Sequence, residues 1–185
     1  MAFILACLGF AGCVGPRNGD NVGVDDGQGP EAIRLEVQEE YYQDGTLKRR
    51  VEGRIDSEDN FILHGLTTAY WENDQKKLEL TYVDGIRHGP RTAWYRNGEI
   101  WSQGRWTDGR EDGIWTVWFP NGRKAQELPL VKGAWHGTYR EWHLNGQKKR
   151  EVEYVKGKQQ GTEMIWNDKG EIAKQTEYVD GVAQP

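Results

Sequence analysis

Three histidines are the first residues in this sequence that could do chemistry, because histidine is the commonest metal ligand in proteins. His64, His88 and His136 stand 24 or 48 residues apart, each just before a glycine. In a sheet with two strands for each repeat, such positions lie about 9–10 Å apart, whereas the ligand atoms of a metal lie about 2 Å from it. Asp112 and Gln160 continue the same column. We therefore interpret these positions as solvated loop residues, and we expect neither a metal nor a cofactor.

No group of residues typical of a catalytic site accompanies the histidines. Ser57 and Ser102 are the only serines, and neither lies in the Gly-x-Ser-x-Gly pattern of a hydrolase nucleophile. Glu58-Asp59 and Glu111-Asp112 fall in predicted turns, whereas the paired carboxylates of a glycosidase must flank a cleft. The glycines follow a turn spacing and precede no helix, so they do not form a phosphate-binding loop. We expect a protein that is not an enzyme.

The composition argues against two further classes of protein. The 185 residues carry a formal net charge of -5, which disfavours the basic surface of a nucleic-acid binder. Aromatic residues make up 11% of the chain, whereas disordered proteins are poor in them. Both cysteines, Cys7 and Cys13, lie in the first apolar stretch, so the rest of the chain has no disulfide framework and no cysteine-ligated zinc. We expect a folded protein with no nucleic-acid partner.

The N-terminus carries a short apolar run that ends in a cysteine. An apolar run from Ala2 to Gly12 is too short to span a bilayer, which takes about 20 apolar residues. It ends in Phe10-Ala11-Gly12-Cys13, which is similar to the lipobox in the signal sequence of a bacterial lipoprotein. The resemblance implies that residues 1–12 are removed and that acylated Cys13 anchors the protein in the cell envelope. Val14 would permit placement in the outer membrane of a Gram-negative cell. Cys7 is a weaker candidate for the lipid, and a buried N-terminal strand is the alternative interpretation.

Residues 13–30 are predicted to be a flexible tether, and residues 31–185 a repeat array. The stretch 14–30 contains five glycines and two prolines and almost nothing to bury. Beyond it, whole columns of residues recur every 24 positions. An earlier copy begins near Tyr41 and carries five extra residues around 56–60, and the last copy stops at Pro185, which gives about six units. The clearest columns are Gly85, Gly109, Gly133, Gly157 and Gly181; Tyr82, Trp106, Leu130, Tyr154 and Tyr178; and Tyr70, Trp94, Trp118, Trp142 and Trp166.

Each unit contains two turn sequences and two short segments rich in Trp, Tyr, Val and Thr. Such segments are typical of β-strands. Asn-Gly, as at Asn145-Gly146, favours a two-residue type I′ turn, in which both residues have positive φ. The second turn is Asp-Gly or Lys-Gly, followed four residues later by another glycine. The sequence therefore predicts an all-β fold: an elongated, open antiparallel β-meander of repeated hairpins, with a leading strand at Ile33, Leu35 and Val37.

The charges beside Asn145-Gly146 predict the register of that hairpin. A two-residue loop places Glu141 opposite Arg150 and Arg140 opposite Glu151, whereas a three-residue loop places Arg140 opposite Arg150. Facing opposite charges stabilise a strand pair by roughly 0.2–1 kcal/mol, and facing like charges destabilise it. We therefore expect the two-residue register. One face then carries aliphatic side chains with the Tyr82 column, and we expect this apolar face to be exposed and to bind a partner.

The opposite, polar face would carry a ladder of tryptophans among threonines and glutamates. Such columns mostly stabilise the sheet, but rings about 10 Å apart could also stack on a glycan or contact a partner protein. We expect Trp101 to stand opposite Trp94 and to widen this platform. The candidate binding residues are Trp94, Trp101, Trp118, Trp142 and Trp166.

The repeated unit resembles a known repeat family. Tyr82-Val83-Asp84-Gly85 followed by Gly89 is similar to the core of a MORN repeat, and Trp142-His143-Leu144-Asn145-Gly146 is similar to its variant form, found in bacterial proteins labelled as YwqK-type antitoxins. The resemblance covers nearly the whole chain after the tether. It implies an elongated sheet of β-hairpins that contacts proteins or membrane lipids and has no catalysis of its own.

Three functions of different classes remain open at this point, one of which is an enzyme accessory that only positions another molecule. The first is a membrane-anchored scaffold that binds a protein partner or associates with itself, and that acts as an antitoxin-like or immunity-like neutraliser. The alternative is a cell-wall or polysaccharide-binding lipoprotein that uses the tryptophan ladder on a glycan.

Overall fold

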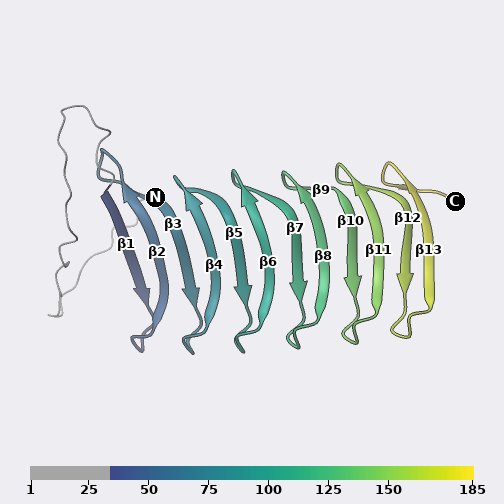
Figure 1. Cartoon of the computed structure of the whole chain (residues 1–185), viewed down its shortest axis with the longest axis horizontal. Helices are drawn as coiled ribbons and strands as arrows, with labels where there is room; N and C mark the ends of the chain where they lie inside the picture. The colour runs from purple at the N-terminus through teal and green to yellow at the C-terminus, as the bar shows by residue number, and fades with distance from the viewer. Residues whose placement is uncertain (1–33) are drawn as a thin grey trace. The chain divides into compact units, whose positions relative to one another are not determined.

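A computed structural model describes residues 34–185, and these form a single antiparallel β-sheet (Figure 1). The predicted fold class is confirmed, and no helix occurs among the described residues, so none there could cross a membrane. The predicted leading strand is present from residue 34 onward. The strands are β1 (Arg34–Tyr41), β2 (Leu47–Ile55), β3 (Phe61–Tyr70), β4 (Lys76–Val83), β5 (Ile86–Trp94), β6 (Ile100–Thr107), β7 (Arg110–Trp118), β8 (Lys124–Val131), β9 (Ala134–Trp135), β10 (Gly137–Trp142), β11 (Lys148–Val155), β12 (Lys158–Trp166), β13 (Ile172–Val179) and β14 (Val182–Ala183).

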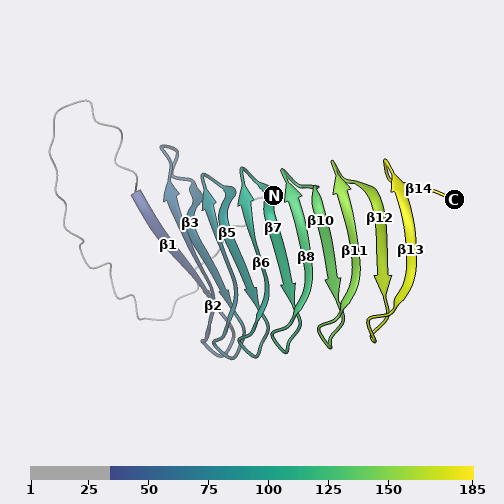
Figure 2. The same ribbon diagram turned by 45° about the vertical axis from the view of Figure 1, so that its right-hand side comes forward.

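Within this sheet each strand pairs with the next one along the chain. The order runs from β1 to β8, continues through β10 to β14, and leaves short β9 paired with β8. The strands lie side by side and are visibly curved in two views (Figures 1 and 2). Because neighbours in space are neighbours in sequence, each 24-residue unit adds two strands to the row.

The type I′ turns occur at the Asp-Gly and Lys-Gly sequences, not at Asn-Gly. Both turn residues have positive φ there, for example 48° at Asp84 and 78° at Gly85. Val83 pairs directly with Ile86 across this two-residue loop. At Asn145-Gly146, by contrast, only Gly146 has positive φ among the two. The prediction of a type I′ turn at Asn145-Gly146 is therefore wrong.

The Asn-Gly hairpins instead use a three-residue loop, and a bulge restores the predicted register. His143 donates its backbone N–H to the carbonyl of Gln147 at 2.8 Å, and Gly146 donates to the carbonyl of His143 at 2.8 Å. Trp142 then pairs with Lys148, and the register shifts by one residue before Glu141 pairs with Arg150. Glu141 opposite Arg150 and Arg140 opposite Glu151 are both confirmed. The predicted strand pairing is right although the predicted turn type is wrong. A three-residue loop followed by one bulged residue gives the same offset between the two strands as a two-residue loop.

Asparagine recurs in these turns because its side chain ties one unit to the next. The Asn145 amide Oδ1 accepts the backbone N–H of Gln147 at 3.0 Å, and its Nδ2 donates to the Asp168 carbonyl at 2.6 Å. The residue two positions before the asparagine makes a second link. Trp71 Nε1 donates to the Trp94 carbonyl at 3.2 Å, and the Tyr95 hydroxyl donates to the Trp118 carbonyl at 2.8 Å. The turns are thus stacked by hydrogen bonds along the array.

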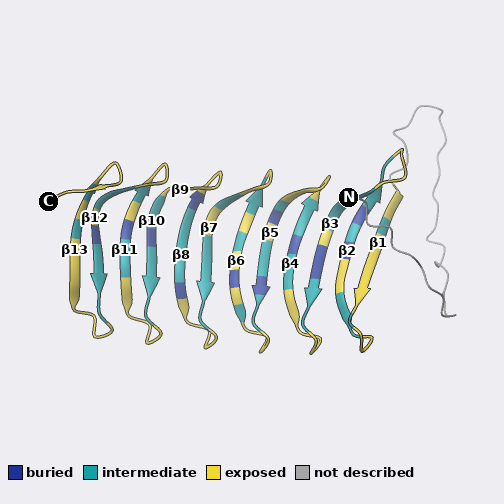
Figure 3. Cartoon of the chain, turned by 180° about the vertical axis from the view of Figure 1, so that it is seen from behind, coloured by how far each residue is buried: buried dark blue, intermediate teal, exposed yellow. Residues whose placement is uncertain are grey.

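The core lies on one face of the sheet, which we call the core face, and corresponds to the predicted apolar face. Figure 3 shows buried positions on many of the strands. Val152 is only 1% exposed. The expectation that this face exposes its aliphatic side chains is wrong at most of them, because neighbouring aromatic and long side chains of the same sheet cover them. The buried apolar residues of the sheet are Val51, Leu80, Ala93, Ala125, Leu130, Tyr139 and Val152.

Candidate functional site

The side chains of the histidine column contact the next turn of the array. His64 Nδ1 lies 3.1 Å from Asp84 Oδ1 and accepts the Asp84 backbone N–H at 3.4 Å. Asp112 accepts the Lys132 backbone N–H at 3.0 Å, and Gln160 accepts the equivalent N–H of Asp180. Each side chain thus presents an acceptor to the first residue of the next type I′ turn. Among the described residues no group of three or more metal-ligating side chains comes together.

The face opposite the core, which we call the ladder face, carries Trp94, Trp118, Trp142 and Trp166 as predicted. All four are partly buried, and the aromatic ring pairs within residues 34–185 include none between two of them. Lysine ammonium groups lie over two of the rings: Lys76 is 5.7 Å from the Trp94 centroid, and Lys148 is 5.6 Å from that of Trp166. These lysines cover part of the aromatic surface that a ligand would need.

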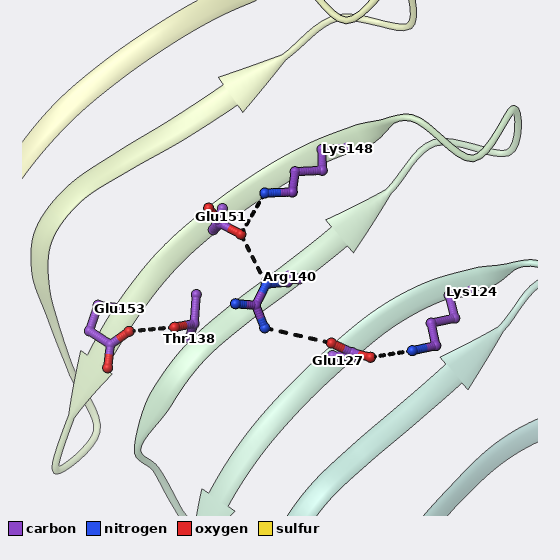
Figure 4. Close-up of polar contacts among 7 residues, drawn as sticks. All are labelled: Lys124, Glu127, Thr138, Arg140, Lys148, Glu151 and Glu153. Carbon is purple, nitrogen blue, oxygen red and sulfur yellow. Dashed lines mark hydrogen bonds and ion pairs between the residues drawn. The ribbon is translucent and has the colours of Figure 1, made fainter.

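Ion pairs and hydrogen bonds link the charged residues of the ladder face (Figure 4). Arg140 donates from Nε to Glu151 Oε2 at 2.9 Å, and its Nη1 lies 3.7 Å from Glu127 Oε2. Lys148 and Lys124 pair with the same two glutamates at 2.9 and 2.5 Å. Burial opposes the charge of Glu151, but the hydrogen bonds from Lys148 and Arg140 outweigh it and lower the pKa of this carboxyl. The charges at this end of the ladder face are therefore largely satisfied within the protein.

Trp101 does not join the ladder. Trp94 pairs with Ile100, Ala93 pairs with Ser102, and Trp101 is the bulged residue between them. The bulge turns its side chain to the core face, where its ring lies 6.4 Å from that of Tyr95. The expectation that Trp101 stands opposite Trp94 is wrong for this reason. With 45% of its surface exposed, Trp101 remains accessible on the core face.

A cluster of tryptophans and arginines occupies the core face between β4 and β8. Trp106 and Trp115 pack edge to face with centroids 5.7 Å apart. The guanidinium of Arg91 lies 5.3 Å from the Trp115 ring and 5.8 Å from the Trp101 ring, and that of Arg87 lies 4.8 Å from the Trp106 ring. Such arginine–aromatic stacking is common where proteins bind ligands or partners.

Gly104 makes room for this cluster. A Cβ at this position would meet ring carbons of Trp115 at 2.2 Å, so the indole lies directly against the glycine backbone. Leu80, Leu128 and Val152 occupy the equivalent position in other units. Compared with the other units, this unit has no side chain at position 104 and a large one at position 115.

Two hollows open beside Trp115 on the core face. One has a volume of about 280 Å³ and lies between Leu80, Arg87 and Trp106. The other has a volume of about 250 Å³ and lies between Trp101, Val117 and Leu128. Arg91, Glu111 and Trp115 line both hollows. The core face therefore has a shaped surface at this place rather than a flat one.

The residues of this cluster were not predicted, because the repeat is recognised from columns whose residue type stays constant. The centre of the core face is a column that changes in every unit, and the neighbouring column does the same. The cluster could have been identified from a position in the repeat whose residue type varies while the neighbouring columns stay constant. The two columns are Thr67, Arg91, Trp115, Tyr139 and Glu163, and Leu63, Arg87, Glu111, Trp135 and Gln159.

Further along the core face, Arg150 is paired with a glutamate of the protein itself. Arg150 donates to Glu163 at 2.6 Å, and this glutamate is only 4% exposed. Burial opposes the charge on Arg150, but the hydrogen bond and attraction to Glu163 raise its pKa. Arg150 faces Glu141 in register, yet it bonds to Glu163, while Glu141 accepts from Lys149 at 2.7 Å. Two separate ion pairs thus neutralise the charges on this part of the face.

Comparison with protein families finds the repeat in three places. Residues 63–84, 87–108 and 135–156 match a repeat described as the MORN repeat variant, and together they make up about a third of the chain. Each match ends on the first residue of a type I′ turn. Repeats of this kind generally contact proteins or membranes and are non-enzymatic. No curated protein matches the chain. The candidate lipidation site, Cys13, lies outside the described residues.

Proposed function

We propose that this protein is a non-catalytic, membrane-anchored scaffold that binds a protein partner through the core face between β4 and β8. The observation that carries the proposal is the exposed Trp101 beside two hollows that share Arg91 and Trp115. Tryptophan and arginine are the residues most enriched among those that dominate binding energy at protein interfaces. Hollows of this size accept single side chains of a partner, not a drug-sized ligand.

The repeat array holds this surface in place before a partner arrives. Trp115 lies against Gly104, and the stacked turns fix the strands that carry both residues. A partner therefore does not have to order these side chains on binding, which lowers the entropic cost of association. In the cell, acylated Cys13 and the tether through residue 30 would hold the array at the envelope membrane. The partner we favour is a toxic protein that the scaffold neutralises.

Site-specific photocrosslinking in cells tests the proposal. A photoreactive residue at position 101 should crosslink a discrete partner, and one at Ile172, which is also exposed and lies near the C-terminal end, should not. With the partner purified, Trp101→Ala should weaken binding about tenfold or more. Equal crosslinking from both positions, or none from either, would rule out a partner on this surface. A neutraliser also requires that the full chain suppress the partner's own activity.

The membrane anchor has an independent test. Cys13→Ala should release the protein from the membrane fraction or leave it unprocessed, because the acyl chains would be absent. Fractionation and the mass of the mature protein measure this, and a variant with unchanged mass and membrane association would contradict the anchor. Replacement of Cys7 by alanine is the matched control and should leave both properties unchanged.

A polysaccharide ligand on the ladder face is the second candidate, and one observation favours it. A hollow of about 470 Å³ opens beside Trp118, between Thr92, Gln103 and Thr116. Ile100 stands in the position from which Lys76 and Lys148 lie over Trp94 and Trp166. The lysine that would lie over Trp118 is therefore absent, although Lys124 of the same column lines the hollow. Retention of the full chain on peptidoglycan, lost in Trp118→Ala but not in Trp101→Ala, would support this ligand over a protein.

A further inference from the structure

The hollow between β4 and β7 has an unusual set of hydrogen-bond donors. Arg87 and Arg91 line it from β5, Trp106 from β6 and Trp115 from β7, over a floor that includes Leu78 and Leu80. The volume is about 280 Å³. Trp115 Nε1 already donates to the Arg105 carbonyl at 3.3 Å. Arg87, Arg91 and the Trp106 indole contribute only donors, which suits a ligand that only accepts.

Neither arginine has an anionic partner within the described part of the chain. The ion pairs within 4.0 Å among residues 34–185 include none with Arg87 or Arg91, and Arg91 donates to the Ser102 hydroxyl. Burial lowers the pKa of Arg91, which the charge of nearby Glu111 partly offsets. Arg150, on the same face, has Glu163 at 2.6 Å. The protein thus neutralises Arg150 internally and leaves Arg91 without an equivalent partner.

An unsatisfied donor lies at the same place. Trp106 Nε1 is buried and has no hydrogen-bond partner, one of two such side-chain atoms within residues 34–185. A buried donor without an acceptor destabilises the protein, because it has lost its hydrogen bond to water and gained none. The guanidinium of Arg87 lies 4.8 Å from the centroid of this indole, so an acceptor bound by Arg87 would lie close to the Trp106 ring.

We propose that this hollow binds the carboxylate of an acidic side chain from the protein partner, held by Arg87 and Arg91 with Trp106 Nε1 as a further donor. The inference rests on the proposed function for the identity of the occupant. Arginine forks match the two oxygens of a carboxylate, and charge-assisted hydrogen bonds of this kind are the strongest in proteins. The apolar floor and the Trp115 ring contact the methylene groups that carry the carboxylate.

The local charge selects a carboxylate over a phosphate group. Two arginines and Glu111 line the hollow, so its net charge is one positive unit. A single carboxylate neutralises that charge, whereas a phosphate with close to two negative charges leaves an excess beside Glu111. The size agrees, because about 280 Å³ is at the lower limit of ligand pockets and suits one side chain.

Nuclear magnetic resonance of the full chain tests the site without a partner. The probe is N-acetylglutamate N-methylamide, and the readout is the indole N–H resonance of Trp106, identified by its absence in Trp106→Phe. We expect the probe to move this resonance in a saturable way, and the neutral glutamine analogue to leave it in place. Arg87→Gln and Arg91→Met should each weaken binding about tenfold or more. Arg105→Gln, which changes an arginine on the ladder face, is the matched control.

Each other outcome overturns the inference. No movement of the Trp106 resonance, or equal movement with the glutamine analogue, shows that the hollow does not bind a carboxylate. Tighter binding of inorganic phosphate assigns the site to phosphate instead. Arg87 is exposed, so Arg87→Gln decides the result if Arg91→Met fails to fold. If the probe binds but position 101 crosslinks no partner, the proposed protein-binding function is wrong and the carboxylate site is retained. If position 101 crosslinks a partner but the probe does not bind, the function is retained and the carboxylate site is wrong.

Discussion

Replacing Gly104 by alanine should destabilise the protein, although alanine normally stabilises a strand relative to glycine. The new Cβ would lie 2.2 Å from Cδ2 and Cε2 of Trp115, whereas carbon atoms in contact lie about 3.5–4.0 Å apart. The two residues belong to neighbouring strands, and the contacted atoms are ring carbons. The overlap therefore requires the whole indole to move. Overpacking of this kind costs about 1–3 kcal/mol.

The sign of the effect should reverse once the indole is removed. Gly104 has no positive φ, so alanine fits the backbone there. In a Trp115→Ala background the overlap is gone, and Gly104→Ala should stabilise the protein by about 0.5–1 kcal/mol because alanine loses less backbone entropy on folding. The expected coupling between the two positions is thus about 1.5–4 kcal/mol.

Chemical denaturation of the four proteins measures this coupling. Unfolding of the wild-type chain, both single variants and the double variant is followed by circular dichroism, and the free energy of unfolding is extrapolated to water. A Trp101→Ala background serves as the control, because Trp101 is not among the nearest atoms to position 104 and the cost should persist. If Gly104→Ala has the same effect with and without Trp115, the indole does not lie on Gly104, and the shape deduced for both hollows is wrong.

Three further predictions concern stability. Phe119 occupies the position from which the Tyr95 hydroxyl bonds to the next unit, so Phe119→Tyr should add a hydrogen bond to the Trp142 carbonyl and raise the free energy of unfolding by about 0.5–1.5 kcal/mol. Tyr95→Phe should lower the free energy of unfolding by a similar amount. Denaturation midpoints equal to that of the wild type would contradict this link. Arg150→Met should destabilise the protein by about 3 kcal/mol, because it leaves buried Glu163 without its partner. Adding Glu163→Met should recover most of the lost free energy of unfolding. If the effects of the two single changes simply add in the double variant, the two residues do not interact. Burial raises the pKa of Tyr139 to about 12, above its value of about 10 in the unfolded chain, so the neutral hydroxyl stabilises the fold below pH 10 and this contribution is lost as the pH rises towards 12. Tyr139→Phe should therefore unfold less steeply with pH over that interval in denaturation at alkaline pH, and an unchanged slope would show that Tyr139 titrates normally.

Much of the fold could be predicted because the sequence states its repeat many times. Each column constrains the same backbone position in several units, so the period and the alternation of strands and turns are overdetermined. The offset of Glu141 against Arg150 was also predictable from charge, and the structure confirms it. The turn type was not, because a two-residue loop and a three-residue loop with one bulge give the same pairing. Cross-strand charges report only the final register.

The sequence by itself thus determined the all-β class, the order of the strands and the face that holds most of the core. Only the tertiary structure decided the surroundings of individual side chains. A bulge moves Trp101 to the core face, and the missing side chain of Gly104 lets Trp115 lie across the neighbouring strand. Arg91 then stacks between two indoles, whereas Arg150 meets a buried glutamate. The physical reason is that a repeat fixes the backbone, while contacts depend on neighbours one and two strands away. Where those neighbours change from unit to unit, the same position becomes core in one unit and a candidate binding surface in the next.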